Sequence, residues 1–204
     1  IGLDHRIGQS AIHAGIGWGG SCFPKDISSL IHMGDGMNRG MELLKSVRRI
    51  NDEQIDYYLA KVERVLGALD GKVLAVLGLS FKPNTDDIRE SPALKLIPKL
   101  LEKKAIVKLS DPVALGHIRH LWPEVIRHTD PQNALRGADA CLLITDWEHF
   151  IQADWKAVKN IMNTPIIFDG RNCLDPNQMA QIGFCYYGIG RGKPMPDTAV
   201  VGNA

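Results

Sequence analysis

One cysteine stands where a nucleophile could be activated. Cys22 lies in the segment GGSCFPKD, between a glycine-rich loop and an expected helix start, and Lys25 follows three residues later. A helix N-terminus and a neighbouring lysine both favour the thiolate over the thiol. An isolated cysteine is more often an inert buried residue, but this local setting reverses that expectation. The sequence therefore predicts that Cys22 is a nucleophile.

A carboxylate follows the cysteine after one helical turn. Asp26 could orient or activate water beside Cys22. Its other interpretation is structural, because an aspartate before an apolar run is a typical helix N-cap, and this helix would end near Gly34 and Gly36. The residues alone leave both interpretations open.

Two further segments carry cationic side chains that could bind a phosphate or carboxylate. The segment GLSFKPNTDDIRESPA follows an expected buried strand, and ligands of such sheets bind beyond the carboxyl ends of strands. It lacks a GxGxxG turn, so Lys82 and Arg89 would supply the contacts. Arg171, in FDGRNCLD, occupies a similar position and could form bidentate contacts. The alternatives are a solvated loop for the first segment and a surface ion pair for Arg171.

The remaining chemical groups favour structural roles. Asp111 ends a strand before a proline, where a turn is favoured over a ribose contact. Cys141 and Cys185 lie within expected strands and are predicted core residues, while Cys173 is ambiguous. The histidines do not cluster at ligand spacing, so we expect no metal site.

Helices should position the cysteine. Four glycines between 15 and 20 predict a loop that approaches a ligand closely. Apolar residues at three- and four-residue steps predict a long amphipathic helix over residues 40–66. Residues 1–67 are therefore expected to be helical and to form a first domain.

The second expected domain, residues 68–204, has the pattern of a parallel α/β sheet. KVLAVLGL is a continuous apolar run typical of a strand buried on both faces. Further strands are expected at 106–109, 140–144, 165–168 and 184–187, and helices from Ser91-Pro92 and near 113–121, 131–136, 154–162 and 175–182. This alternation predicts a Rossmann-like, doubly wound parallel sheet. The proline- and glycine-rich residues 191–204 are expected to form a loose terminus.

Charge and composition exclude several classes of protein. Lysine and arginine total 24 against 23 acidic residues, so no basic field favours nucleic-acid or anionic-membrane binding. The longest apolar run is too short to span a bilayer, and there is no signal sequence. Four scattered cysteines suit a reducing cytoplasm. The chain begins at Ile1 inside an apparent element, so we expect that an N-terminal part is missing.

Two motifs together carry a family resemblance. With GIGWGGSCFPKD followed by FKPNTDDIRESPA, and with DHRIG upstream and FDGR downstream, the sequence resembles the UDP-glucose/GDP-mannose dehydrogenase family over nearly its whole length. The resemblance implies an NAD-binding domain upstream of this chain, the latter part of a central helical domain at 1–67, and a nucleotide-sugar-binding domain at 68–204. The family's long central helix forms dimers, and the amphipathic stripe of residues 40–66 could bury its apolar side in this way, so we expect a homodimer through residues 40–66.

The resemblance assigns roles to individual residues. Cys22 matches the nucleophile that forms a thiohemiacetal and then a thioester during the two-step oxidation of a sugar alcohol by NAD, and Asp26 matches a carboxylate that positions water. Cofactor contacts correspond to Ser21, Cys22, Lys25 and Arg89. Substrate contacts correspond to Arg6, which reaches the substrate of a partner subunit, and to His13, Gly17, Trp18, Gly19, Phe81, Lys82 and Arg171.

The match departs from the family pattern at two positions. His13 stands where some relatives have a lysine, and Trp18 replaces the more usual phenylalanine or tyrosine, so we expect the fit around the nucleotide to differ in detail. The glycine-rich NAD turn and other catalytic residues would lie upstream, so the chain alone is expected to be inactive.

Three alternatives to a UDP-glucose dehydrogenase remain. The first is a GDP-mannose dehydrogenase, although DHRIG and GGSCFPKD favour UDP-glucose as the substrate. A nucleotide-sugar-binding or dimerisation module without catalysis is the second alternative. A cysteine-dependent redox or hydrolytic enzyme is the third, and it lacks a recognisable histidine partner, since only His13 and His32 are near.

Overall fold

The computed structural model of the chain describes residues 1–8 and 12–191. The predicted loose terminus lies outside the described residues, except for Arg191.

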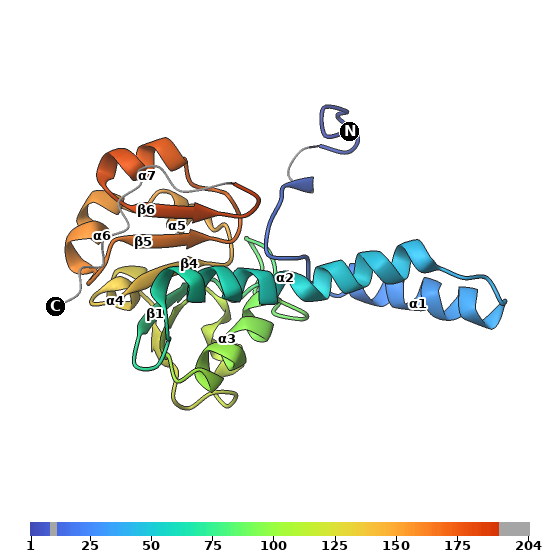
Figure 1. Cartoon of the computed structure of the whole chain (residues 1–204), viewed down its shortest axis with the longest axis horizontal. Helices are drawn as coiled ribbons and strands as arrows, with labels where there is room; N and C mark the ends of the chain where they lie inside the picture. Colours follow the sequence, from blue (N-terminus) through green and yellow to red (C-terminus); the bar gives the residue numbers. More distant parts are fainter. Residues whose placement is uncertain (9–11, 192–204) are drawn as a thin grey trace.

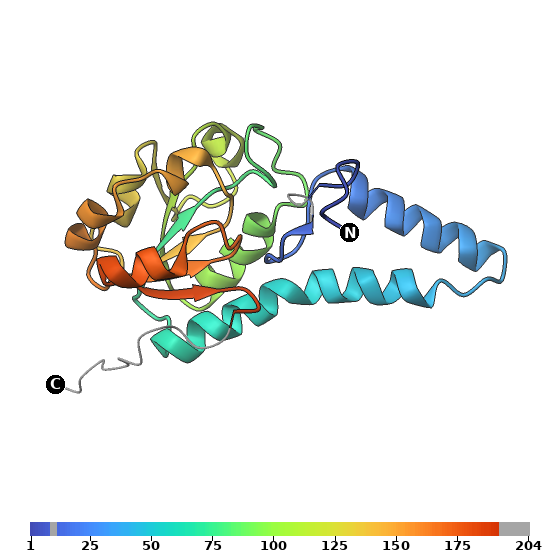
Figure 2. The ribbon, with the colours of Figure 1, turned by 90° about the horizontal axis from the view of Figure 1, so that it is seen from above.

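Two helices form a hairpin at the start of the chain. They are α1 (Cys22–Gly36) and α2 (Glu42–Leu66). Figure 2 shows them side by side, projecting from the rest of the molecule. An ion pair of 2.9 Å between Lys45 Nζ and Asp35 Oδ1 joins them near their tip. The long helix predicted over residues 40–66 is thus confirmed within two residues.

Two predictions about this region are wrong. Residues 1–8 and 12–21 are loops and turns apart from a single 3-10 residue at Ile12, not α-helix, because repeated glycines interrupt any helical pattern there. Asp26 is not an N-cap, since α1 begins four residues earlier with Ser21 at the cap position. Pro24 falls in the first turn, where a missing N–H costs nothing, and this allows the earlier start.

Six parallel strands form one sheet in the order β3-β2-β1-β4-β5-β6. The chain runs outward from β1 in one direction and then from β4 in the other, so the strand order reverses between β1 and β4. The predicted α/β class is therefore confirmed. The short strand β3 was not predicted, because three residues at an edge show no apolar run. The strands are β1 (Val73–Leu77), β2 (Ile106–Ser110), β3 (Ile126–His128), β4 (Ala140–Leu143), β5 (Ile166–Asp169) and β6 (Cys185–Gly188).

Helices cover both faces of the sheet (Figure 1). Leu74 and Val76 pack with α2 and α3 on one face, whereas Ala75 and Leu77 pack with α4, α6 and α7 on the other. This alternation explains why β1 is apolar at every position. The covering helices are α3 (Pro92–Glu102), α4 (Pro131–Leu135), α5 (Glu148–Ile151), α6 (Trp155–Ile161) and α7 (Pro176–Ile182), with the 3-10 helix η2 (Ala114–Ile118) after β2.

The amphipathic stripe of α2 is divided between two surroundings. Its C-terminal half is buried against the sheet through Ile55, Leu59 and Val62, and the Tyr58 hydroxyl donates to the Phe168 carbonyl at 2.8 Å. The apolar stripe that suggested a dimer face is thus partly consumed by packing within the chain. A second set of exposed apolar side chains remains on α2: Leu43, Ile50 and Tyr57.

None of the helices in residues 1–8 and 12–191 is long and apolar enough to cross a membrane.

Candidate functional site

The loop before α1 lies against the carboxyl ends of the strands. Ile16 N–H donates to the Gly170 carbonyl after β5 at 3.0 Å, and Gly20 N–H donates to the Arg89 carbonyl after β1 at 2.9 Å. These bonds place the predicted cysteine loop beside the strand-order reversal, where doubly wound sheets bind ligands. The term cysteine loop is used below for residues 12–21.

Close packing explains two of its glycines. A Cβ on Gly19 would overlap the Glu90 carbonyl. Gly17 has a φ of +104°, and a Cβ there would lie 3.0 Å from Asn51 Oδ1. Both positions therefore exclude larger residues, so the glycines serve the approach of the loop to its neighbours.

A cavity of about 370 Å³ opens between the cysteine loop, α2 and the loop after β5. It brings together four of the predicted substrate residues, although His13 and Arg171 are far apart in the sequence. Its polar lining consists mainly of an imidazole, two amides and a guanidinium, which suits an anionic, hydrogen-bonding ligand. The lining residues are His13, Gly15, Gly17, Trp18, Val47, Ile50, Asn51, Gln54 and Arg171.

Arg171 is fixed by the protein backbone rather than by a surface ion pair. Its Nε donates to the Ile144 carbonyl at 2.7 Å and its Nη2 to the Phe81 carbonyl at 2.8 Å. Burial lowers the pKa of Arg171, while the charges of Asp146 and Asp169 act in the opposite direction. A partly buried guanidinium without a paired carboxylate is available to an anion, and Nη1 has no hydrogen-bond partner among residues 1–8 and 12–191.

The four other predicted substrate residues do not line this cavity. Phe81 is half-buried under the cysteine loop, and the exposed Lys82 places its Nζ 5.6 Å from the Phe81 ring centroid. Gly19 is buried against the loop after β1. Arg6 is exposed and bonded to Asp4 at 2.7 Å.

Cys22 is the first residue of α1 and is exposed. Ser21 has no side-chain capping bond, and no acidic residue occupies the first turn of α1, so this helix end keeps its positive character. Asp26 is on the same helix one turn later, where its Oδ1 lies 3.2 Å from Lys25 Nζ. The predicted catalytic pair thus shares one face of α1.

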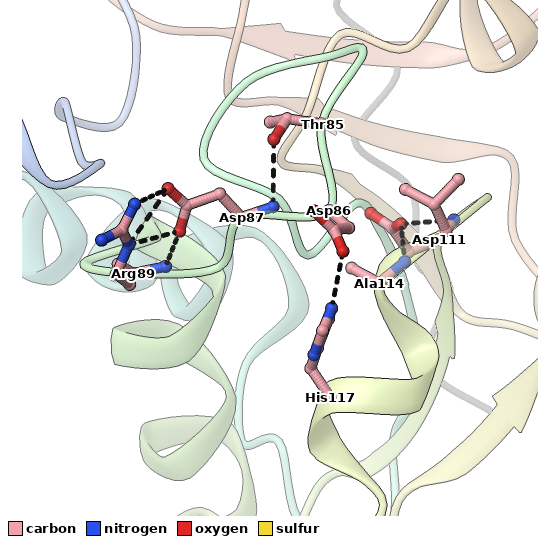
Figure 3. Close-up of polar contacts among 8 residues, drawn as sticks. Thr85, Asp86, Asp87, Arg89, Asp111, Ala114 and His117 are labelled. Carbon is pink, nitrogen blue, oxygen red and sulfur yellow. Dashed lines mark hydrogen bonds and ion pairs between the residues drawn. The ribbon is translucent and has the colours of Figure 1, made fainter.

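Arg89 is held within its own loop by Asp87 (Figure 3), and its backbone carbonyl accepts from Gly20 N–H, two residues before Cys22. Its Nη2 lies 2.7 Å from Asp87 Oδ2, and Asp87 accepts from the Arg89 backbone at 2.9 Å as well. The guanidinium lowers the pKa of Asp87 to about 2, and the nearby carboxylate raises the pKa of Arg89. In the same loop Asp86 lies 3.0 Å from His117 Nε2, which ties the loop to η2.

Asp111 is a structural residue, in agreement with the predicted turn. Its Oδ1 accepts from Val113 and Ala114 N–H groups, as Figure 3 shows, and its Oδ2 accepts from Leu79 N–H at 2.7 Å. The side chain is almost fully buried, so no oxygen is left for a ribose.

The other cysteines are less exposed than Cys22. Cys141 is fully buried in β4, as predicted, and burial raises its thiol pKa far above the usual range. Burial also raises the pKa of Cys173, with the charges of Asp169 and Asp146 adding to it. Cys185 lies in β6 and is partly buried. Within residues 1–8 and 12–191, no group of histidine, cysteine and acidic side chains is arranged to hold a metal ion.

The sequence did not predict that α2 forms one wall of the cavity. Asn51 and Gln54 line the cavity, and Asn51 is buried. One signal could have revealed Asn51, because it is a polar residue at four-residue steps from Val47 and Ile55 on an otherwise apolar stripe.

Comparison with known families gives two matches. The UDP binding domain of the UDP-glucose/GDP-mannose dehydrogenase family matches residues 75–176, and the central domain of the same family matches residues 1–53. The first match covers half of the chain and the second contains the cysteine loop.

Individual relatives agree with these matches. The UDP-glucose 6-dehydrogenase YwqF of Bacillus subtilis is 40% identical over 201 residues, which cover 98% of this chain and 46% of that protein. A UDP-glucose 6-dehydrogenase of Pseudomonas aeruginosa is 40% identical over 198 residues, covering 94% of this chain and 44% of that protein. The chain therefore spans less than half the length of these relatives.

A solved structure shares the fold. The UDP-glucose dehydrogenase of the archaeon Pyrobaculum islandicum superposes with a TM-score of 0.80 and 35% identity, covering 94% of this chain and 42% of that one.

Proposed function

This chain belongs to the UDP-glucose/GDP-mannose dehydrogenase family, and on that premise we propose that it forms the nucleotide-sugar-binding and nucleophile-bearing part of an NAD-dependent UDP-glucose 6-dehydrogenase. The proposed reaction oxidises the primary alcohol of UDP-glucose to the carboxylate of UDP-glucuronate.

One observation carries the proposal. The cavity joins His13 and Trp18 of the cysteine loop to the partly buried Arg171 after β5, and Cys22 begins α1 at the end of the same loop. A diphosphate at Arg171 would be anchored by charge-assisted hydrogen bonds, and the sugar would extend toward the thiol. Binding energy at the nucleotide would thus orient the reacting carbon.

Cys22 would act between the two oxidation steps. Its thiolate adds to the aldehyde carbon, a C–S bond forms, and the carbonyl oxygen takes a proton to give a thiohemiacetal. Loss of hydride and a proton gives a thioester. Water then attacks this carbon, the C–S bond breaks, and the thiolate leaves. Asp26, one turn from Cys22, is the proposed group that orients this water.

The surroundings of Cys22 suit the cofactor of this reaction. The uncapped N-terminus of α1, Lys25 and Arg89 together offer positive charge and N–H donors for a diphosphate. NAD, when bound, accepts the two hydrides. The residues of this chain proposed to hold it are Ser21, Cys22, Lys25 and Arg89.

The substrate is proposed from similarity and from the cavity together. The relatives with 40% identity are named UDP-glucose 6-dehydrogenases, which favours UDP-glucose over GDP-mannose. Because the chain spans less than half of their length, we propose that the activity requires the part of the enzyme that carries the NAD-binding domain, and that this chain alone binds substrate without oxidising it.

Three further proposals accompany this function. The chain would form a homodimer through residues 40–66, in which Arg6 reaches the other subunit's substrate. Residues 1–67 and 68–204 would be its two domains. A free Cys22 thiol suits a reducing compartment, so the enzyme would work in the cytoplasm.

Calorimetric titration of the chain with UDP-glucose, and separately with GDP-mannose, tests the proposal. We expect saturable binding of UDP-glucose that weakens roughly tenfold or more on Arg171→Ala, because charge-assisted hydrogen bonds are lost. We expect a smaller loss on Lys82→Ala. Arg136→Ala and Lys156→Ala, exposed and remote from the cavity, are the matched controls.

Each outcome has a distinct meaning. Binding of GDP-mannose alone would replace the proposed substrate. Binding of neither nucleotide sugar would contradict the proposal that the site is formed by this chain.

A further inference from the structure

Asn51 is an unusual residue in the middle of α2. Its side chain is only 8% exposed, whereas asparagine is a poor helix former and a costly residue to bury without partners. Both sides of its amide are used. Trp18 N–H donates to Asn51 Oδ1 at 2.8 Å, and Asn51 Nδ2 donates to the Trp18 carbonyl at 3.2 Å.

This amide is the link between α2 and the cysteine loop. The loop is bonded to the α/β sheet region through Ile16, Gly20 and the Ala14 carbonyl. Among the described residues 12–21, the only hydrogen bonds to α2 are the two made by Trp18 to Asn51. Without Asn51, all the hydrogen bonds that hold the loop to other elements would come from the sheet region.

The backbone geometry of the loop is fitted to this contact. Gly17 takes a φ of +104°, and the space that a Cβ would fill is occupied by Asn51 Oδ1 at 3.0 Å and the Asn51 carbonyl at 3.3 Å. The glycine therefore lets the loop backbone reach the amide. Residue 17 and residue 51 are a matched pair.

The contact extends to both ends of the site. Trp18 and Asn51 line the cavity that contains Arg171, and both also line a second hollow toward α1. The Trp18 ring packs edge-on against Phe23, with ring centroids 6.0 Å apart, and Phe23 directly follows Cys22. A shift of the Trp18 backbone would thus move the cavity wall and disturb the packing beside the thiol.

We propose that Asn51 is a positioning residue, which holds the Gly17–Trp18 backbone against α2 and thereby sets the cavity wall and the packing at the start of α1. Its effect on ligand affinity rests on the proposed function; its effect on the loop does not.

Hydrogen exchange of the Trp18 backbone amide tests the inference directly, because this N–H donates the hydrogen bond to Asn51 Oδ1. We expect Asn51→Ala to lower the protection of this amide roughly tenfold, the loss expected for one hydrogen bond. Asn163→Ala is the matched control, since it removes an exposed asparagine that bonds to Asp139 instead, and it should leave Trp18 protected as in the parent chain.

Asn51→Asp adds a readout that general loss of structure would not reproduce. A neutral carboxylic acid can accept from Trp18 N–H and donate to the Trp18 carbonyl as the amide does, whereas a carboxylate can only accept. The second carboxylate oxygen would face the Trp18 carbonyl and repel it, which displaces the loop even though the first oxygen can still accept from Trp18 N–H. Protection, corrected for intrinsic exchange at each pH, should therefore be reduced at neutral pH and return toward the parent value in mild acid. Asn51→Ala should show no such recovery.

The outcomes separate this inference from the proposed function. Parent-like protection of Trp18 in Asn51→Ala, or no recovery of Asn51→Asp in acid, would overturn it. If the parent binds UDP-glucose, Asn51→Ala should weaken that binding at least several-fold, and equal affinity would overturn the effect on the site. If the parent binds no UDP-glucose, the proposed function fails, while the exchange data still decide the role of Asn51.

Discussion

At the scale of single residues, the four cysteines are distinguished by burial. Cys22 is exposed at a helix start, whereas burial raises the pKa of the Cys141 and Cys173 thiols well above the ordinary value. Since the thiolate is the reactive form, the same side chain has very different reactivity at these positions.

We therefore predict an order of alkylation in the native chain. Limited iodoacetamide should modify Cys22 first and Cys141 and Cys173 last, as measured by peptide mass spectrometry. In concentrated urea the four rates should converge, which serves as the control. Modification of Cys173 as fast as Cys22 under native conditions would contradict the buried environment described above.

The Asp87–Arg89 pair makes a prediction about pH. The guanidinium lowers the Asp87 pKa from 3.8 to about 2 in the folded chain, so the unfolded chain takes up this proton first as the pH falls. The stabilisation of the folded chain by this pair is therefore complete above pH 3.8 and is lost as the pH falls toward 2. Because the Arg89 side chain is 68% exposed, solvent screening keeps the contribution small.

Carboxyl-carbon NMR titration measures this shift. The Asp87 signal should titrate near pH 2 in the parent chain and at higher pH in Arg89→Ala, where the backbone N–H of residue 89 still lowers the Asp87 pKa in part. A parent midpoint close to 3.8 would show that the ion pair does not persist in solution. Asp87→Asn should lower stability at neutral pH, and this difference should shrink in acid.

At the scale of elements, local signals set the start of α3. Ser91 is fully buried and its hydroxyl accepts from Ala93 N–H at 3.2 Å, with Pro92 at the first helical position. This is the arrangement that the Ser-Pro pair predicts, because it satisfies one free N–H and removes another.

Removing this cap should have a measurable cost. Ser91→Ala should lower the free energy of unfolding by about 1 kcal/mol in urea denaturation. Ser29→Ala is the control, because Ser29 is exposed on α1 and its hydroxyl makes no hydrogen bond among the described residues. Its effect should stay within about 0.5 kcal/mol. Equal effects of the two substitutions would argue against the cap.

At the scale of the whole molecule, α2 serves two surfaces. Its buried residues complete the core of the α/β sheet, while Leu43, Ile50 and Tyr57 are 78%, 50% and 69% exposed. These three recur every seven residues and so share one side of the helix. A projecting hairpin with such a stripe is a suitable surface for a second copy of the chain (Figure 2).

We predict a homodimer at micromolar concentration, measured by light scattering. Leu43→Glu should shift it toward monomer, because a charge would be buried in the contact, and the melting of the monomer fold should change little. Lys156→Glu, on α6 at the other face of the sheet, should leave the dimer intact. A monomeric parent would rule out this assembly.

Local signals were sufficient for much of the fold. The apolar run at β1, the Ser-Pro start of α3 and the helical periodicity of α2 depend on neighbouring residues, so the sequence alone predicted them. Asp26 and β3 show the limits of such signals. A proline in the first turn moved the start of α1, and β3 is a strand only because β2 lies beside it.

The candidate site also combines residues that local signals predict with residues that only the tertiary structure brings together. The sequence alone singled out Cys22 as a candidate nucleophile, because the glycine loop, the helix start and the lysine that distinguish it are all adjacent to it in the chain. Only the tertiary structure joined Arg171 to Trp18, assigned half of α2 to the core, and placed the Asn51 amide on the backbone of a loop 33 residues earlier. These contacts are non-local, and no short-range pattern encodes which distant backbone a partly buried guanidinium or a buried amide will meet.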